Sequence, residues 1–429
     1  MKKILRVILI FIITFSVSIY LIEKNIEKLI SANFSNNEFV NVRLDDIDIN
    51  IYGNIVLNNL YISNKDNDSI FFSKNFKINP LSLKDVLFKN KLNIKKAEII
   101  DGILNTDLLD QILSKKNNNV FDENIIISEL DLKNFNIDNS YIISKAKFLN
   151  FIYKKESIDF KIQDFSLEYE NYRVNKFNAD IFFNNKKIYL KDFFVNINNS
   201  DLSGNVEIKH FFDLDSIKYF GKLRSEKFVV SDFFPTIKDI SYTFSSNFNG
   251  DLKKISLNDL KINNQTTEFI GNINLTGFMN NKFDRIIIDV EKFSSNSFEL
   301  EETFPNIFGS ILPTSLSSIG DFDFSGLTNY SKNVVQSSFN LKMNDGNLSA
   351  NVKISDFDNI DNSKYQGTFK GKNINLKNIT NFSILGTSDF KLEINGRGFT
   401  SEYLDSKLSG EISKFEINEY DYENIEVFG

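Results

Sequence analysis

Residues 130–137 read Leu-Asp-Leu-Lys-Asn-Phe-Asn-Ile (LDLKNFNI). Apolar residues hold the first, third, sixth and eighth places, whereas a regular strand would place them first, third, fifth and seventh. Two adjacent polar residues therefore shift the apolar set by one position. The same form, apolar-x-apolar, polar pair, apolar-x-apolar, recurs at uneven spacing in residues 42–49, 55–62, 76–83, 92–99, 160–167, 188–195, 255–262 and 420–427.

The alternation on both sides of the polar pair predicts strands, and the uneven spacing excludes a fixed-period solenoid. The pair itself is either a bulge, which returns the apolar residues to one face, or a tight turn between two short arms. Pairs such as Lys191-Asp192 lack the glycine that two-residue hairpins prefer, so we favour the bulge. In 76–83, Pro80 cannot donate to a ladder, which predicts a strand end followed by a short helix over 81–88.

The composition limits the classes of function. The chain has 429 residues, enough for two or three domains, and its net charge of −7 argues against nucleic acid. Cysteine is absent, so a disulfide, a thiol nucleophile and a cysteine metal site are excluded. Asn, Ile and Lys are abundant, which is partly the signature of an AT-rich genome. We therefore give the Asn content no functional weight.

The N-terminus is the one stretch of membrane character. Basic residues precede an uncharged apolar run, Val7–Ile22, which reaches spanning length when Ile4 and Leu5 are added. The order of charges predicts a cytoplasmic N-terminus. A signal peptide and a buried core helix are the alternatives, but no Ala-x-Ala site follows the run. We expect an uncleaved anchor and stalk over 1–33 and a β region over 34–429.

The remaining chain is patterned as strands joined by short turns. Hairpins are predicted at 177–183 with 188–194, and at 269–277 with 282–290; a second short helix is predicted at 106–116. No Pro/Gly/Ser-rich linker divides the chain, and roughly 13 residues per strand and turn gives on the order of 30 strands. The predicted fold is mainly β: an elongated antiparallel sheet curled around an apolar groove (a β-taco), preceded by one transmembrane helix, with few short helices. A plain sandwich or a β-helix is the alternative.

A sheet with one apolar face must cover that face, and lipid acyl chains are the obvious filler in a membrane-anchored protein. We therefore expect the apolar residues of the repeats to line the groove and the polar pairs to face solvent. The expected lining residues are Ile55, Leu57, Leu60, Ile62, Leu130, Leu132, Phe135, Ile137, Ile188, Leu190, Phe193, Val195, Ile255, Leu257, Leu260 and Ile262.

No catalytic constellation stands out in the sequence. The single histidine, His210, is followed by two phenylalanines and is interpreted as a structural or surface residue. Residues 321–326 resemble the start of a calcium loop, but Lys332 occupies the place of its bidentate glutamate, so we interpret them as a strand. We expect no enzyme activity, no cofactor and no metal. Glycines in LSG (202–204 and 408–410) and NGRG (395–398) are interpreted as turns or strand edges.

Several stretches together resemble a known family. They are ILPTSLSSIGDFDFSGLT (311–328), SSFNLKMNDGNLSANVKIS (337–355), YQGTFKGKNINLKNIT (365–380), FSILGTSDFKLEINGRGFT (382–400) and YDYENIEVFG (420–429). The chain is similar to the TamB proteins (translocation and assembly module inner-membrane subunit) and the wider AsmA-like group, especially the Bacteroidota forms. The resemblance extends over the chain and is strongest in 311–429, where Pro313, Gly320, Gly326, Gly367 and Gly386 match.

The resemblance implies a single-pass protein of the bacterial inner membrane. The bulk of the chain would cross the periplasm as a β-taco and carry phospholipid toward the outer membrane. Some members act with an outer-membrane barrel of the BamA type through a C-terminal domain that is not in this sequence, and the chain stops mid-pattern at Gly429. We therefore expect an N-terminal portion of a longer protein. The alternatives are a secretion or assembly factor that scaffolds outer-membrane proteins, and a β-helical surface adhesin.

Overall fold

The structure, a computed structural model, describes most of the chain after residue 40. It covers residues 41–429 except 50–53, 81–92, 109–124, 139, 155–156, 170–171, 185, 212, 233–238, 278–283, 304–318, 357–360, 381 and 401. The expected anchor Val7–Ile22 and the helix expected at 81–88 lie outside these residues. Residues 106–108 begin the second expected helix, and the rest of it also lies outside. Across the described ranges, no helix is long and apolar enough to cross a membrane.

The described residues are mainly strand, and the topology assigns their 23 strands to one open sheet. This is fewer than the expected number, because many strands are 10 to 14 residues long. The chain divides into two compact units, with β11 (Ser200–Lys209) split between them. The first unit holds β1 (Asn41–Arg43), β2 (Asp46–Ile49), β3 (Ile55–Ser63), β4 (Ser69–Pro80), β5 (Asn93–Leu104), β6 (Ile125–Ile137), β7 (Tyr141–Lys154), β8 (Ser157–Tyr169), β9 (Tyr172–Asn184) and β10 (Lys187–Ile197). The second holds β12 (Lys218–Val229), β13 (Ser241–Gly250), β14 (Lys254–Asn263), β15 (Glu268–Thr276), β16 (Arg285–Asn296), β17 (Asp321–Ser331), β18 (Val334–Met343), β19 (Gly346–Ser355), β20 (Lys364–Asn375), β21 (Leu385–Arg397), β22 (Asp405–Ile417) and β23 (Tyr420–Phe428).

In the first unit, β1 and β2 both pair with β3, and the later strands follow in chain order. The predicted hairpin of β9 and β10 is confirmed. The expectation of an entirely antiparallel sheet is wrong at one place, because β5 and β6 are parallel. A parallel pair needs a crossover of a dozen or more residues, and the connection 105–124 supplies that length. Strand β4 ends at Pro80, as predicted.

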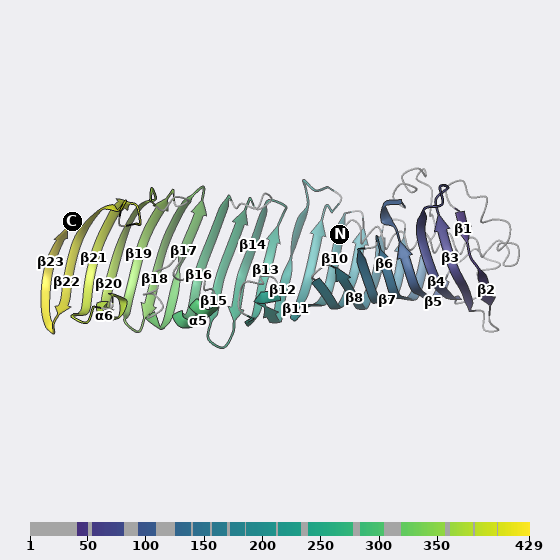
Figure 1. Cartoon of the computed structure of the whole chain (residues 1–429), viewed down its shortest axis with the longest axis horizontal. Coiled ribbons are helices and arrows are strands. Elements are labelled where there is room, and N and C mark those ends of the chain that lie inside the picture. Colours follow the sequence, from purple (N-terminus) through teal and green to yellow (C-terminus); the bar gives the residue numbers. More distant parts are fainter. Residues whose placement is uncertain are drawn as a thin grey trace. The chain divides into compact units, whose positions relative to one another are not determined.

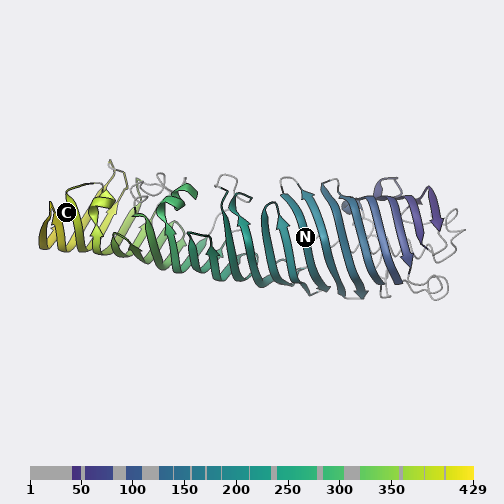
Figure 2. The same ribbon diagram turned by 90° about the horizontal axis from the view of Figure 1, so that it is seen from below.

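In the second unit, β12 to β23 are antiparallel neighbours in chain order (Figure 1). The pairing of β15 with β16 confirms the second predicted hairpin. Short helices follow every fourth strand: η2 (Val230–Asp232), α5 (Ser297–Thr303) and α6 (Leu376–Thr380). Figures 1 and 2 show α5 and α6 at the same edge of this unit's strands.

The polar pairs of seven of the nine repeats lie inside strands, as the bulge interpretation predicts, whereas Asp45 lies between β1 and β2 and Pro80 ends β4. Residues 57–60, 132–135 and 190–193 all lie within single strands, with no chain reversal. In six of the nine copies the second polar residue has a positive φ, as in Asn59 (50°), Asn134 (50°) and Asp192 (48°). Asn and Asp tolerate this left-handed conformation better than other non-glycine residues. The abundance of Asn, which we had discounted, therefore has a structural function.

The polar pairs take two forms, and only the first adds the extra residue that the bulge interpretation predicts. At Lys191/Phe194 and Leu257/Leu260 the register shifts, so that two residues oppose one on the neighbouring strand. At Asn59 and Asn134 the register is kept. On the parallel pair, Asp101 and Asn134 both have positive φ at the same level of neighbouring strands. Both forms return the apolar residues to one face.

The glycines of LSG and NGRG correct a sequence interpretation. Gly204, Gly396 and Gly410 lie inside β11, β21 and β22 and are not turn residues. Gly410 has a φ of 149°, and a Cβ there would lie 2.2 Å from the Lys391 carbonyl oxygen, so a larger residue would clash. Its neighbour Gly398, at the end of β21, does occupy a left-handed turn with a φ of 72°.

Candidate ligand-binding face

The repeats place their apolar residues on one side of each unit, which we call the inward face. Residues paired directly across an antiparallel ladder point to the same face. Ile55 pairs with Ile78, which pairs in turn with Ala97. Ala97 lies beside Leu130 on the parallel neighbour, and the same chain of partners continues to Ala179 on β9, opposite the register shift of β10.

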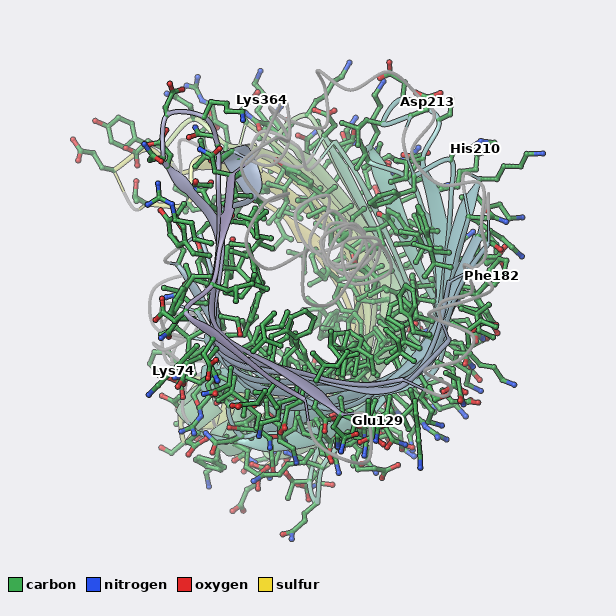
Figure 3. All side chains as sticks on the ribbon, turned by 90° about the vertical axis from the view of Figure 1, so that its right-hand side faces the viewer. Lys74, Glu129, Phe182, His210, Asp213 and Lys364 are labelled. Carbon is green, nitrogen blue, oxygen red and sulfur yellow. The ribbon has the colours of Figure 1, made fainter. Side chains whose placement is uncertain are left out.

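The inward face is concave, and the opposite, outward face carries the charged and amide side chains. Figure 3 shows Lys74, Glu129 and Phe182 on the convex side of the first unit. The polar pairs of the repeats share this side: Asn59, Asn134 and Asp192 are all exposed. The sixteen residues expected to line a groove therefore lie on the inward face of their own unit.

The depth of burial differs between the two units. All eight predicted residues of β3 and β6 are buried; Leu60 is 0% exposed and Phe135 is 1% exposed. On β10, Ile188 and Phe193 are buried, whereas Leu190 and Val195 are half-buried. On β14 of the second unit, Leu260 is buried, whereas Ile255, Leu257 and Ile262 are half-buried. The second unit therefore leaves part of its inward apolar surface accessible.

The inward face of the second unit carries no charge over the described strands β12–β23. On β17 the inward residues are Phe322, Phe324, Gly326, Thr328 and Tyr330. Their partners on β18 are Met343, Leu341, Phe339, Ser337 and Val335. Some hydroxyl groups on this face are paired with one another, as Thr328 and Ser337 are at 2.9 Å. Such a surface favours contact with apolar ligands. It presents no charged side chain to a phosphate or another ion.

Aromatic rings fill the space above several inward glycines. A Cβ on Gly102 would lie 2.3 Å from the ring of Phe135, and one on Gly371 would lie 2.5 Å from the ring of Phe390. A ring packed over a glycine on the next strand compensates for the missing side chain. Part of the high phenylalanine content is explained in this way.

Side chains of the next strand satisfy the backbone of several bulges. The Asp164 N–H donates to Asn178 Oδ1 at 2.8 Å, the Asp192 N–H to Asn205 Oδ1 at 2.8 Å, and the Asp259 N–H to Asn272 Oδ1 at 3.0 Å. A bulge residue leaves the ladder, so its N–H needs another acceptor. Sequence reasoning missed these acceptors, although an Asn recurs 13 or 14 residues after each of these bulges.

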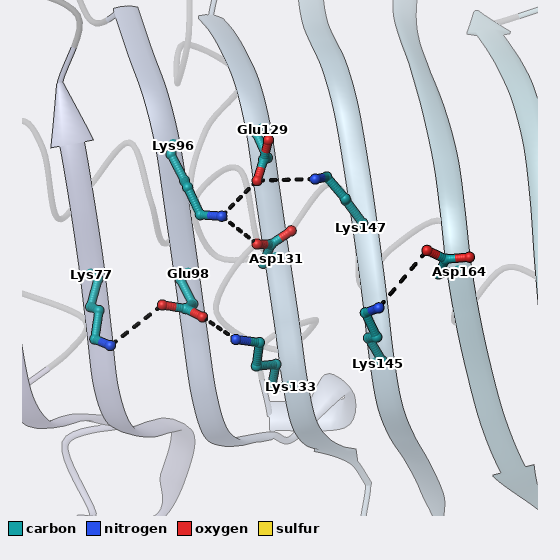
Figure 4. Close-up of polar contacts among 9 residues, drawn as sticks. All are labelled: Lys77, Lys96, Glu98, Glu129, Asp131, Lys133, Lys145, Lys147 and Asp164. Atoms are coloured by element: carbon teal, nitrogen blue, oxygen red, sulfur yellow. Dashed lines mark hydrogen bonds and ion pairs between the residues drawn. The ribbon is translucent and has the colours of Figure 1, made fainter.

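The outward face of the first unit is crossed by a network of ion pairs (Figure 4). Lys96 Nζ lies 2.6 Å from Glu129 Oε1 and 2.7 Å from Asp131 Oδ2, which ties β5 to its parallel neighbour β6. Glu98 contacts both Lys133 and Lys77. Exposed pairs of this kind contribute about 0.2–1 kcal/mol each, so the network supports the pairing of strands and does not define a reactive site.

These contacts shift three ionisation equilibria. Burial alone would raise the pKa of Glu98, but the hydrogen bonds and charges of Lys133 and Lys77 hold it below its usual value. The hydrogen bond from Lys96 lowers the pKa of Glu129, against burial and with further help from Lys147. Hydrogen bonds to Asp131 and Glu129 raise the pKa of Lys96. All three groups are thus stabilised in their charged forms.

The other residues singled out in the sequence have ordinary surroundings. His210 is exposed, follows β11, and donates its backbone N–H to the Lys186 carbonyl oxygen. Residues 321–326 belong to β17, as interpreted. Within the described ranges, no group of three His, Cys, Asp or Glu side chains could hold a metal ion.

The comparisons with known proteins identify no relative. No family model, no curated protein and no solved structure matches the chain.

Proposed function

We propose that this chain is a membrane-anchored carrier of phospholipid in the bacterial envelope. The observation that carries the proposal is the uncharged, half-exposed inward face of β12–β23. An apolar surface of this extent is unfavourable in water, and acyl chains would cover it without needing any hydrogen bond. The phosphate headgroup would remain in water, because the face offers it no charged partner.

Two features of the sequence set the proposal in a compartment. The basic residues before Val7–Ile22 support an uncleaved inner-membrane anchor with a cytoplasmic N-terminus and a periplasmic β region. The resemblance of 311–429 to TamB and AsmA-like proteins supports transport toward the outer membrane. A contact with a BamA-type barrel would need a C-terminal region outside this sequence.

An assembly factor that scaffolds outer-membrane proteins is the second candidate, and the two hypotheses differ in what occupies the inward face. Mass spectrometry of lipids that co-purify with the detergent-extracted chain separates them. Phospholipid retained in stoichiometric amount through detergent exchange is the expected result. Retention no greater than that of an unrelated single-pass protein would leave the lipid-carrier proposal without support and favour the assembly factor.

A further inference from the structure

The outward face of the second unit contains a hollow of about 660 Å³ over β17–β22. Six of its lining residues form a row that runs across the six strands, each directly opposite the next in the ladder register. This amide row consists of Asn329, Gln336, Lys353, Gln366, Asn395 and Lys407. The amide row thus presents four amide and two ammonium groups in one line across the strands.

The polar groups of the amide row are largely unused within the chain. Elsewhere on this unit's outward face, neighbours across the ladder bind one another: Lys292 with Glu268 at 2.6 Å, and Asn296 with Asp321 at 2.6 Å. In the row, Asn329 accepts a hydrogen bond from Arg285. The side chains of the other five make no hydrogen bond or ion pair to any described residue. The amide and ammonium donors of the row face the hollow and are not bonded to side chains of the adjacent strands.

The shape of the row indicates a linear ligand. Strands lie about 4.8 Å apart, so six strands present polar groups along roughly 24 Å. An added peptide strand does not fit this place, since both edges of β18–β21 already pair with their neighbours. A protein partner would need an apolar centre, and Leu327, which is 48% exposed, is the one apolar side chain that this face contributes to the hollow. Hydroxyl-rich chains match the amides better, because amides both donate and accept.

The charges narrow the choice further. Lys353 and Lys407 lie in the amide row, and Glu393 is the one acidic residue that lines the hollow. We propose that the amide row binds a linear polysaccharide bearing carboxylate groups, laid across β17–β22. The amides would bind the hydroxyl groups, the two lysines would bind carboxylates, and Leu327 would contact the carbon face of a sugar ring.

The experiment is an isothermal calorimetric titration of the full chain, held in detergent micelles, with a linear oligogalacturonate. A neutral cello-oligosaccharide of equal length serves as the second probe. Gln366→Ala and Lys353→Ala should each weaken oligogalacturonate binding up to about tenfold, the equivalent of one hydrogen bond, neutral for Gln366 and charge-assisted for Lys353. Lys370→Ala is the matched control. Lys370 is exposed on the outward face of β20, the strand of Gln366, but it does not line the hollow.

The expected result is saturable binding of oligogalacturonate, weaker binding of the neutral probe, and no effect of Lys370→Ala. Failure of both probes to bind overturns the proposal. Equal weakening by Lys370→Ala and Lys353→Ala also overturns it, because the attraction would then be unspecific charge. Equal affinity for both probes overturns it as well, because the carboxylates would then contribute nothing to binding. The thermal midpoint of each variant, expected to match that of the unmodified chain, shows that the fold is intact.

Discussion

Replacement of Leu257 by Asp tests the accessibility of the inward face. Leu257 lies half-buried on β14, between Phe248 on β13 and Ile273 on β15. Complete burial of a leucine side chain stabilises by about 1.5–3 kcal/mol, so losing half of it costs about 1 kcal/mol. Water beside the open face can hydrate the new carboxylate. We therefore expect Leu257→Asp to lower the free energy of unfolding by only about 1–2 kcal/mol.

Leu60→Asp is the contrasting substitution, because Leu60 is 0% exposed. The full transfer energy is lost there, and the carboxylate must be buried or protonated, which costs several kcal/mol more. We expect a loss of about 4 kcal/mol or more. Asn263→Asp adds the same charge on the exposed outward side of β14, directly opposite Glu268, and the resulting like-charge pair should cost less than about 1 kcal/mol.

Urea unfolding is monitored by circular dichroism, and the phospholipid content is measured on the same preparations. Leu257→Asp should keep its fold and lose bound phospholipid, and Asn263→Asp should keep both. If Leu257→Asp unfolds as readily as Leu60→Asp, the inward face of the second unit is a sealed core. If it folds and retains all its phospholipid, acyl chains do not contact β14. Either result would contradict an inward face that is open to water and in contact with phospholipid.

Three further changes test the local structure. Asn272→Ala removes the acceptor for the Asp259 N–H and should cost about 1 kcal/mol in urea unfolding; an unchanged midpoint would mean that water replaces the cap. Gly326→Val should be more destabilising than Gly320→Val. Both glycines have a positive φ that strains a valine, but a Cβ on Gly326 would also lie 2.3 Å from the Ser338 carbonyl oxygen, while Gly320 has nothing within 4 Å; similar losses would contradict the clash. Glu98→Gln removes a carboxyl group whose pKa is lowered in the folded chain. The variant should therefore be less stable by about 0.5–1 kcal/mol above pH 5, and this difference should disappear as pH falls below 4.5. A stability difference that persists unchanged at pH 3 would contradict the ion-pair explanation.

The polar pair made much of this fold predictable from the sequence. In residues 130–137, the shift from Leu132 to Phe135 predicts one continuous strand with both residues on the same face. The structure shows this, although Asn134 leaves the register with β7 unshifted. The second polar residue carried a further signal, because it is Asn or Asp in copies such as 55–62 and 188–195, where φ is positive. We assigned that signal to genome composition, and so missed the reason for the asparagines.

Other features depend on which strands pair and in which register. The residue pattern of a single strand does not contain that information. The parallel pairing of β5 and β6 follows from a long connection, and the alternation of β6 is the same for either direction. The acceptor role of Asn205 toward the Asp192 N–H exists only once β11 is placed against β10. The amide row likewise becomes visible only when the register aligns Gln336, Lys353 and Gln366.

The contact between acyl chains and the inward face is the central claim, and photocrosslinking tests it most directly. Leu341 and Lys342 are neighbours on β18 that point to opposite faces, inward and outward. A photoreactive phenylalanine analogue at each position, irradiated in intact cells, can capture whatever touches it. We expect phospholipid adducts by mass spectrometry at position 341 and none at position 342. Equal labelling at the two positions, or protein adducts without lipid at position 341, would contradict it.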